Sequence, residues 1–100
     1  MIYKISVPQV ADVEEIRVLE WHGEVGHHFG AGDLVVELET HKAIVEVRAA
    51  QAGCLRKILS EAGKWQTIGL PLAILSDNAS EAVPDDMPAL KDLAVDFEIT

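Results

Sequence analysis

Cysteine and long hydrophobic runs are what this sequence has least of. Cys54 is the single cysteine, so an internal disulfide is impossible, and we expect a reducing compartment, the cytoplasm. No run of about 18 apolar residues occurs, so we expect no membrane-spanning helix and no membrane partner. The opening stretch from Met1 to Pro8 does not have the layout of a signal peptide.

Basic residues are also scarce, with 8 Lys and Arg against 17 Asp and Glu and a formal net charge of −9. This surplus of acid would repel a phosphate backbone, so we expect no nucleic-acid partner. Signals of catalysis are missing too, because neither Ser60 nor Ser76 has a G-x-S-x-G context and 100 residues leave little room for a deep cleft. We therefore expect a domain that is not itself an enzyme.

The four histidines raise the question of a metal site. They are His22, His27, His28 and His41. No cysteine or paired-histidine spacing completes a set of four ligands, so the sequence predicts no metal site.

The composition divides the chain into two parts. Residues 1–76 are dense in Val, Ile and Leu and predict one folded domain. Residues 77–100 hold seven acidic residues and one basic residue, and the polar, proline-bearing stretch 77–88 is typical of a linker. The last twelve residues fit a strand or a helical face equally well, so we expect an acidic linker or a loosely packed tail, which is loosely held or covers a sheet edge.

An internal repeat is the most informative pattern. A shift of 37 residues superposes Gly26 on Gly63 and Gly32 on Gly69, within the stretches GHHFGAG and GKWQTIG. Apolar positions on both sides match as well: Val18, Val35 and Leu38 fall on Leu55, Leu72 and Leu75. The repeat predicts two similar β units, related by approximate two-fold symmetry and packed face to face.

Two stretches predict a long β-hairpin. In 33–39, Leu34, Val36 and Leu38 would face one way and Val35, Glu37 and Glu39 the other; in 43–48, Ala43, Val45 and Val47 would face inward. The residues between them, Thr40, His41 and Lys42, would form a short polar tip.

Residues 11–23 conflict with the repeat, because local rules favour a helix there. The repeat superposes 18–23 on a strand-like stretch, and we follow it because tertiary context often overrides propensity. The predicted fold class is therefore all-β, a flattened β-barrel or sandwich of two small antiparallel sheets with internal quasi-two-fold symmetry, a barrel-sandwich hybrid.

Lys42 is the residue best placed for chemistry. A lysine at a hairpin tip has a mobile side chain on a fixed backbone, which a covalently attached carrier group requires. The surrounding sequence, Glu39 to Ala43, reads ETHKA and resembles the ETDKA signature of lipoyl domains in 2-oxo acid dehydrogenase complexes, members of the biotinyl/lipoyl attachment family. Gly26, 16 residues before Lys42, and Gly53, 11 residues after it, match the glycine frame of that family, and the resemblance covers roughly residues 3–76.

The resemblance implies that Lys42 carries lipoate in amide linkage. The chain would then be an acyl carrier that meets a lipoate-attaching enzyme, a thiamine-dependent decarboxylase, an acyltransferase and dihydrolipoyl dehydrogenase. It also implies that the loop 11–14 lies near the lysine and helps a decarboxylase to choose this domain. The recognition residues that the resemblance implies are Glu39, Thr40, His41, Ala43, Gly26 and Gly53.

His41 is the departure from the family pattern, which usually has aspartate there. An imidazole replaces a fixed negative charge, so we expect lipoylation to proceed and the usual decarboxylase to recognise the tip differently. Two alternatives stay open. A biotin carrier of the same fold is one, although such domains typically place methionine on both sides of the lysine. The other is an unmodified interaction module of the same fold.

Overall fold

The computed structural model describes residues 1–7, 13–82 and 90–99. The described residues form strands and no helix, so the predicted all-β class is confirmed. The strands are β1 (Ile2–Ser6), β2 (Glu15–Trp21), β3 (His28–Phe29), β4 (Leu34–Glu39), β5 (Ile44–Ala49), β6 (Gly53–Ile58), β7 (Trp65–Thr67), β8 (Pro71–Ser76), β9 (Lys91–Asp92) and β10 (Val95–Ile99).

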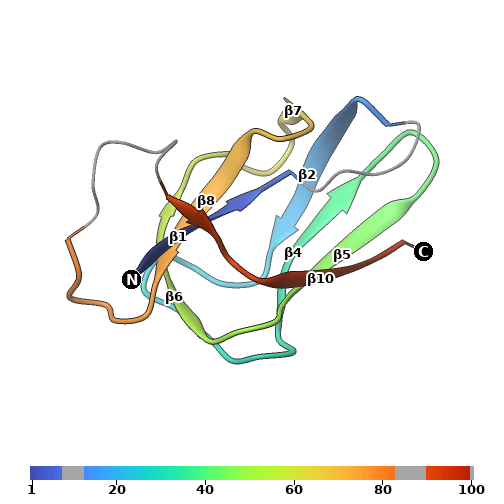
Figure 1. Ribbon diagram of the computed structural model, residues 1–100. Helices are drawn as coiled ribbons and strands as arrows, with labels where there is room; N and C mark the ends of the chain where they lie inside the picture. Colours follow the sequence, from blue (N-terminus) through green and yellow to red (C-terminus); the bar gives the residue numbers. More distant parts are fainter. Residues whose placement is uncertain (8–12, 83–89, 100) are drawn as a thin grey trace.

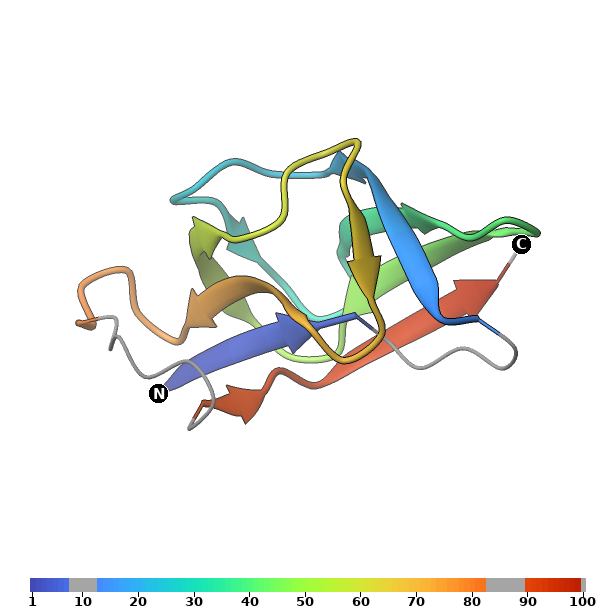
Figure 2. The same ribbon diagram turned by 90° about the horizontal axis from the view of Figure 1, so that it is seen from above.

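These strands build two five-stranded sheets that pack as two layers (Figures 1 and 2). One has the order β3-β6-β8-β1-β9 and the other the order β7-β2-β4-β5-β10. All pairs are antiparallel except β1 with β9. No helix in the described part of the chain is long and apolar enough to cross a membrane.

The predicted repeat is present in the hydrogen bonds that two equivalent turns make to neighbouring strands. The backbone N–H of Gly26 donates to the carbonyl of Leu55 at 2.7 Å, and the N–H of Gly63, 37 residues later, donates to Val18 at 2.7 Å. Both glycines have positive φ, 99° and 90°, a conformation that glycine adopts with little cost. The matched apolar positions are all fully buried: Val18, Val35, Leu38, Leu55, Leu72 and Leu75. The two-fold relationship is therefore built from equivalent contacts on both sides of one core.

Residues 15–21 form strand β2. The strand that the repeat predicted is therefore confirmed here, and the helix that local rules favoured is wrong. Ile16 and Val18 are fully buried and alternate with more exposed neighbours, as a strand with one face on the core requires. The strand lies between β4 and β7, where its backbone is paired on both sides.

The strict alternation predicted for 34–39 is wrong at its start. A register irregularity between Leu34 and Val36 shifts the pleat, so Val35 and Val36 are both fully buried, whereas Leu34 is half-buried. A bulge adds one residue to one strand and thereby moves the following side chains to the other face. From Val36 onward the pattern holds, with Leu38 buried and paired with the buried Val45.

The described part of the acidic tail pairs with both sheets. β9 pairs with β1 and β10 pairs with β5, so this segment covers one edge of each sheet, one of the outcomes that the sequence left open. Between the two strands Leu93 is 3% exposed and belongs to the common core, and its N–H donates to the carbonyl of Lys4 at 2.8 Å. The division after residue 76 stays a prediction, and residues 83–88 of the expected linker at 77–88 lie outside the described residues.

Candidate functional site

Lys42 lies at the end of the β4–β5 hairpin, at the opposite end of the molecule from the N-terminus (Figures 1 and 2). Its side chain is exposed, as is that of His41. The backbone N–H of Thr40 donates to the carbonyl of Ala43 at 2.8 Å, so His41 and Lys42 alone form the turn. The predicted hairpin tip is therefore present, with the lysine at its outermost part.

Thr40 holds the backbone of this turn. Its side chain is 6% exposed, and its hydroxyl oxygen accepts hydrogen bonds from the N–H groups of Lys42 at 3.1 Å and Ala43 at 2.9 Å. The same hydroxyl lies 3.2 Å from the carbonyl of Ala43, to which it donates. A side-chain oxygen that satisfies turn N–H groups rigidifies a turn. The lysine side chain is thus free to move while its Cα is held in place.

Glu39 and Arg17 form an ion pair beneath the tip. The two residues lie opposite each other in the pairing of β2 with β4, and an Arg17 Nη2 contacts Glu39 Oε1 directly. Both side chains are about a third exposed, at 37% and 33%, so the pair lies at the surface of the sheet. Glu39 is therefore a fixed carboxylate two residues before His41 rather than a loose one.

Trp65 joins this pair to the tip. Its ring stacks on His41 with 4.7 Å between ring centroids and 18° between ring planes. The Arg17 guanidinium carbon lies 5.6 Å from the Trp65 centroid, within the range of a cation–π interaction. Arg17 and Trp65 are also opposite each other in the pairing of β2 with β7. Glu39, Arg17, Trp65 and His41 thus form a continuous set of contacts beside Lys42.

The sequence alone singled out neither Trp65 nor Arg17 as a functional residue. The pairing register of β7 with β2 could have identified both residues, because it places Trp65 opposite Arg17, and Arg17 is in turn opposite Glu39 on β4. The other tryptophan, Trp21, packs against the core and donates from Nε1 to the carbonyl of Ser60 at 2.8 Å.

Two of the predicted recognition residues, Gly26 and Gly53, lie away from the tip. Gly26 bonds to Leu55 of β6, and Gly53 opens that strand opposite Phe29 of β3. β6 lies on the side of the molecule away from the β4–β5 tip (Figure 1). A Cβ at Gly53 would lie 3.4 Å from Leu75, so this glycine allows close packing. The structure gives both glycines a structural role, and their role in recognition stays a prediction.

The loop predicted to lie near the lysine is described only in part. Residues 11 and 12 lie outside the described residues. Glu14 lies just before β2, and its carbonyl accepts a hydrogen bond from Ile68 at 3.1 Å.

Comparison with known proteins identifies the family. Residues 3–75 match the biotin/lipoyl family model, described as biotin-requiring enzyme. The chain belongs to this family. The lipoyl-type carrier domain inferred from the tip motif is thereby confirmed at the level of the family.

Several curated relatives are named as components of 2-oxoglutarate dehydrogenase or pyruvate dehydrogenase complexes. A dihydrolipoyllysine-residue succinyltransferase component of the 2-oxoglutarate dehydrogenase complex from Staphylococcus saprophyticus is 34% identical over 79% of the chain. The mitochondrial pyruvate dehydrogenase complex protein X component of Saccharomyces cerevisiae is 36% identical over 86% of the chain. The acetyltransferase component of the pyruvate dehydrogenase complex of Cupriavidus necator is 32% identical over 79%. The matches cover 20%, 20% and 14% of the lengths of these relatives.

Proposed function

We propose that Lys42 carries lipoate and that this domain moves acyl groups between active sites of a 2-oxo acid dehydrogenase complex. The observation that carries the proposal is an exposed lysine amine on a two-residue turn that the buried Thr40 holds in place. Amide formation requires only that a modifying enzyme reach the amine, and the exposed tip allows this. Lipoate would supply a disulfide that accepts an acyl group and two electrons.

The contribution of the chain itself is presentation. The rigid turn holds the Cα of Lys42 in one position. Strands β4 and β5 are anchored in the core and fix this turn relative to the rest of the domain. Tethering raises the local concentration of the acyl group at each successive active site. No step of the chemistry requires a catalytic side chain of this domain. This is consistent with a domain that acts as a carrier within a larger component.

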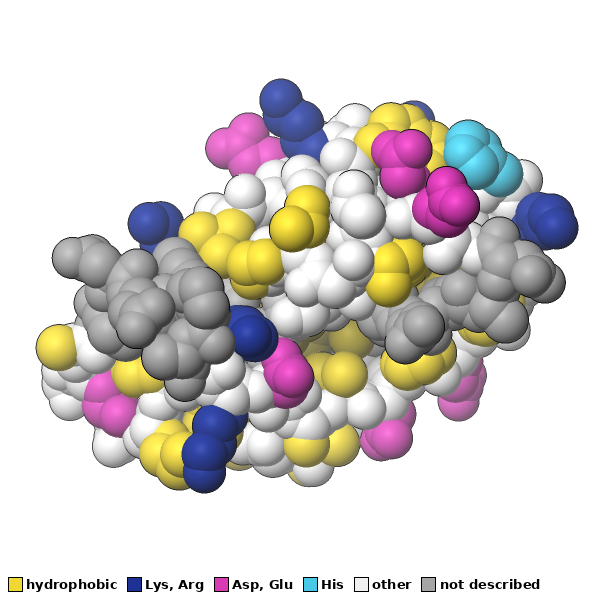
Figure 3. Space-filling view, turned by 45° about the horizontal axis from the view of Figure 1, so that its top comes forward, with side chains coloured by type: hydrophobic (Ala, Val, Ile, Leu, Met, Phe, Trp, Pro, Cys, Tyr) yellow, Lys and Arg dark blue, Asp and Glu magenta, His cyan; other side chains and the backbone are white. Residues whose placement is uncertain are grey.

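The proposed partners follow from this role. They are a lipoate-attaching enzyme, a thiamine-dependent decarboxylase, an acyltransferase and dihydrolipoyl dehydrogenase. On the face shown in Figure 3, hydrophobic, acidic and basic side chains are interspersed and do not gather into one patch of a single kind. We propose that partners select this domain at the tip itself, because Arg17 and Trp65 hold Glu39 and His41 in place there. A cytoplasmic location stays a prediction, which cell fractionation would test.

Intact-mass measurement after expression with lipoate or with biotin tests the attachment. We expect a lipoyl-sized increment on the wild-type chain and on Lys64→Ala, which removes another exposed lysine, and none on Lys42→Ala. A biotinyl-sized increment would establish the biotin-carrier alternative, and no increment under either regime would establish the unmodified module. An increment that persists in Lys42→Ala would place the attachment elsewhere.

His41→Asp separates attachment from partner selection. This variant restores the carboxylate that is usual in the family and removes the stack on Trp65. We expect full lipoylation and a several-fold change in the rate at which a thiamine-dependent decarboxylase acylates the arm. Equal rates for the two chains would show that His41 has no part in selection.

A further inference from the structure

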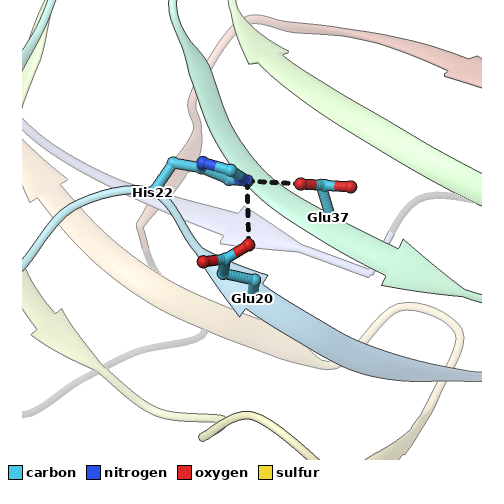
Figure 4. Close-up of side chains that lie close together, drawn as sticks. All are labelled: Glu20, His22 and Glu37. Atoms are coloured by element: carbon cyan, nitrogen blue, oxygen red, sulfur yellow. Dashed lines mark hydrogen bonds and ion pairs between the residues drawn. The ribbon is translucent and has the colours of Figure 1, made fainter.

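A second group of side chains converges on the outer face of the β2–β4 pair, away from the turn at Lys42. His22 Nε2 lies 2.6 Å from Glu37 Oε1 and 3.8 Å from Glu20 Oε2. One ligand atom from each of the three residues lies within 4.8 Å of the other two. Figure 4 shows the imidazole of His22 pointing between the two carboxylates.

The sheet itself creates this convergence. Glu20 lies in β2 and His22 lies in the bend that directly follows this strand, and both side chains point toward Glu37 (Figure 4). Glu37 lies directly opposite Glu20 in the pairing of β2 with β4, just after the irregularity between Val18 and Glu20. The sequence prediction of no metal site counted cysteine and histidine spacing only, and could not see a carboxylate brought in from the neighbouring strand.

The arrangement leaves a negative charge uncompensated. Two carboxylates directly opposite each other on neighbouring strands repel. Among the ion pairs of the described residues, Glu20 and Glu37 pair only with His22, and neither pairs with a lysine or arginine. One Nε2 nitrogen carries at most one proton, so it can donate fully to one carboxylate and not to both. A cation placed between the three groups would relieve the repulsion and use every donor atom.

We propose that Glu20, His22 and Glu37 bind a divalent first-row transition-metal ion through one nitrogen and two oxygens, with water completing the coordination. At metal–ligand distances of about 2.0–2.2 Å, the ligand atoms of a tetrahedral zinc site lie about 3.4 Å apart. The observed separations of 2.6 Å and 3.8 Å lie on either side of that value. Small side-chain rotations are therefore sufficient, and the backbone need not move.

The donor set selects the class of metal. An imidazole nitrogen suits zinc, copper, nickel and iron, whereas calcium and magnesium prefer oxygen ligands only. Glu20 is 68% exposed, which gives an ion a path from solvent, while His22 and Glu37 at 29% and 26% are held closer to the sheet. The bound ion would link β2 to β4, the strand that leads into the tip, independently of whether Lys42 is modified.

Isothermal titration with zinc chloride, on the intact chain without a lipoyl group, tests the site. We expect one ion per chain and at least a tenfold loss of affinity in His22→Gln and in Glu37→Gln. Glu20→Gln should lose less, because Glu20 is the most exposed of the three. The control is His27→Gln/His28→Gln, which removes two other histidines and should bind as the wild type does. Absence of binding, or loss of binding in the control and not in His22→Gln, would overturn the proposal.

A second measurement needs no variant. Substoichiometric copper(II), which an imidazole nitrogen suits, broadens the NMR signals of nuclei near its binding site. We expect selective broadening at residues 20–22 and 36–38, which excess magnesium does not reverse. Broadening centred on residues 27–28, or spread evenly over the acidic surface, would contradict the assignment.

Discussion

His41 and Trp65 stack on each other, 4.7 Å apart and 18° from parallel, and so connect the tip that bears Lys42 to strand β7. The contact continues through Arg17, which lies over Trp65 and pairs with Glu39. Glu39 and His41 flank Thr40, so these contacts brace the tip from both sides. The residue at which the chain departs from the usual family motif therefore has a partner of its own.

Removal of the Trp65 ring should loosen the tip without unfolding the domain. In Trp65→Ala, His41 loses its stacking partner, worth about 0.5–1.5 kcal/mol for an aromatic pair, and Arg17 loses its cation–π contact. We expect faster amide exchange at residues 41–42 with unchanged exchange in β4 and β5. Trp65→Phe should restore most of the protection, and equal exchange in all three chains would show that the stack does not hold the tip.

Loss of the Thr40 hydroxyl should destabilise the turn itself. Thr40→Val keeps the shape of the side chain but leaves the N–H groups of Lys42 and Ala43 without their acceptor. We expect a loss of about 1–3 kcal/mol in the free energy of unfolding, measured with denaturant. Thr40→Ser retains the oxygen and should lose less; a Ser variant as unstable as the Val variant would assign the effect to the methyl group.

Substitution of either symmetry-related glycine should carry a similar cost. A Cβ at Gly26 or Gly63 would meet no atom within 4 Å, so only the positive φ opposes alanine. We expect each variant to lose about 1–2 kcal/mol of stability in denaturant titrations. Gly30→Ala is the matched control without positive φ and should cost less. Markedly different losses for Gly26 and Gly63 would show that the two halves are not energetically equivalent.

Leu93 should connect the tail to the stability of the whole domain. Its side chain is buried at 3% exposure, so Leu93→Ala should lose about 2–5 kcal/mol, the usual cost of truncating a buried leucine. Phe97→Ala, in the same tail but 42% exposed, should lose much less. Equal small losses in thermal unfolding would mean that residues 90–99 do not contribute to folding.

Ion pairs of the Met1 ammonium, at the end of the molecule opposite the tip, should make the stability of the domain depend on pH. The Met1 ammonium donates to Glu81 at 2.7 Å and to Asp77 at 3.0 Å. These hydrogen bonds raise the pKa of the Met1 ammonium above its ordinary 8.0, and the same contact lowers the pKa of Glu81 below 4.5. The ammonium is charged below pH 8.0 and the carboxylate is charged above pH 4.5, even in the unfolded chain. The stabilisation from this ion pair should therefore be complete between pH 4.5 and pH 8.0.

Stability should therefore decline as pH rises through the raised pKa of Met1 and as it falls through the lowered pKa of Glu81. Denaturant midpoints measured from about pH 2 to about pH 10 check this. Glu81→Gln should reduce the decline of stability at both high and low pH. Glu98→Gln, also in the acidic tail, should leave both declines unchanged. Identical pH profiles for wild type and Glu81→Gln would contradict the assignment.

Features that depend on neighbours along the chain were readable from the sequence. The hairpin follows from apolar residues at every second position, and the tip lysine follows from the break between the two runs. The 37-residue repeat predicted both the buried positions and the turn glycines, because each half forms the same local unit and meets the same constraints. It also decided correctly, over residues 15–21, against the helix that local rules favoured at 11–23.

Features that depend on which strands become neighbours were decided by the tertiary structure alone. The stack of His41 on Trp65, the pair of Arg17 with Glu39 and the group of Glu20, His22 and Glu37 all join residues from different strands. The irregularity at Leu34–Val36 likewise arises where β4 must match β5 while it packs on the core. Local periodicity specifies which face of a strand is buried, but cross-strand contacts depend on register and sheet order, which only the folded core fixes.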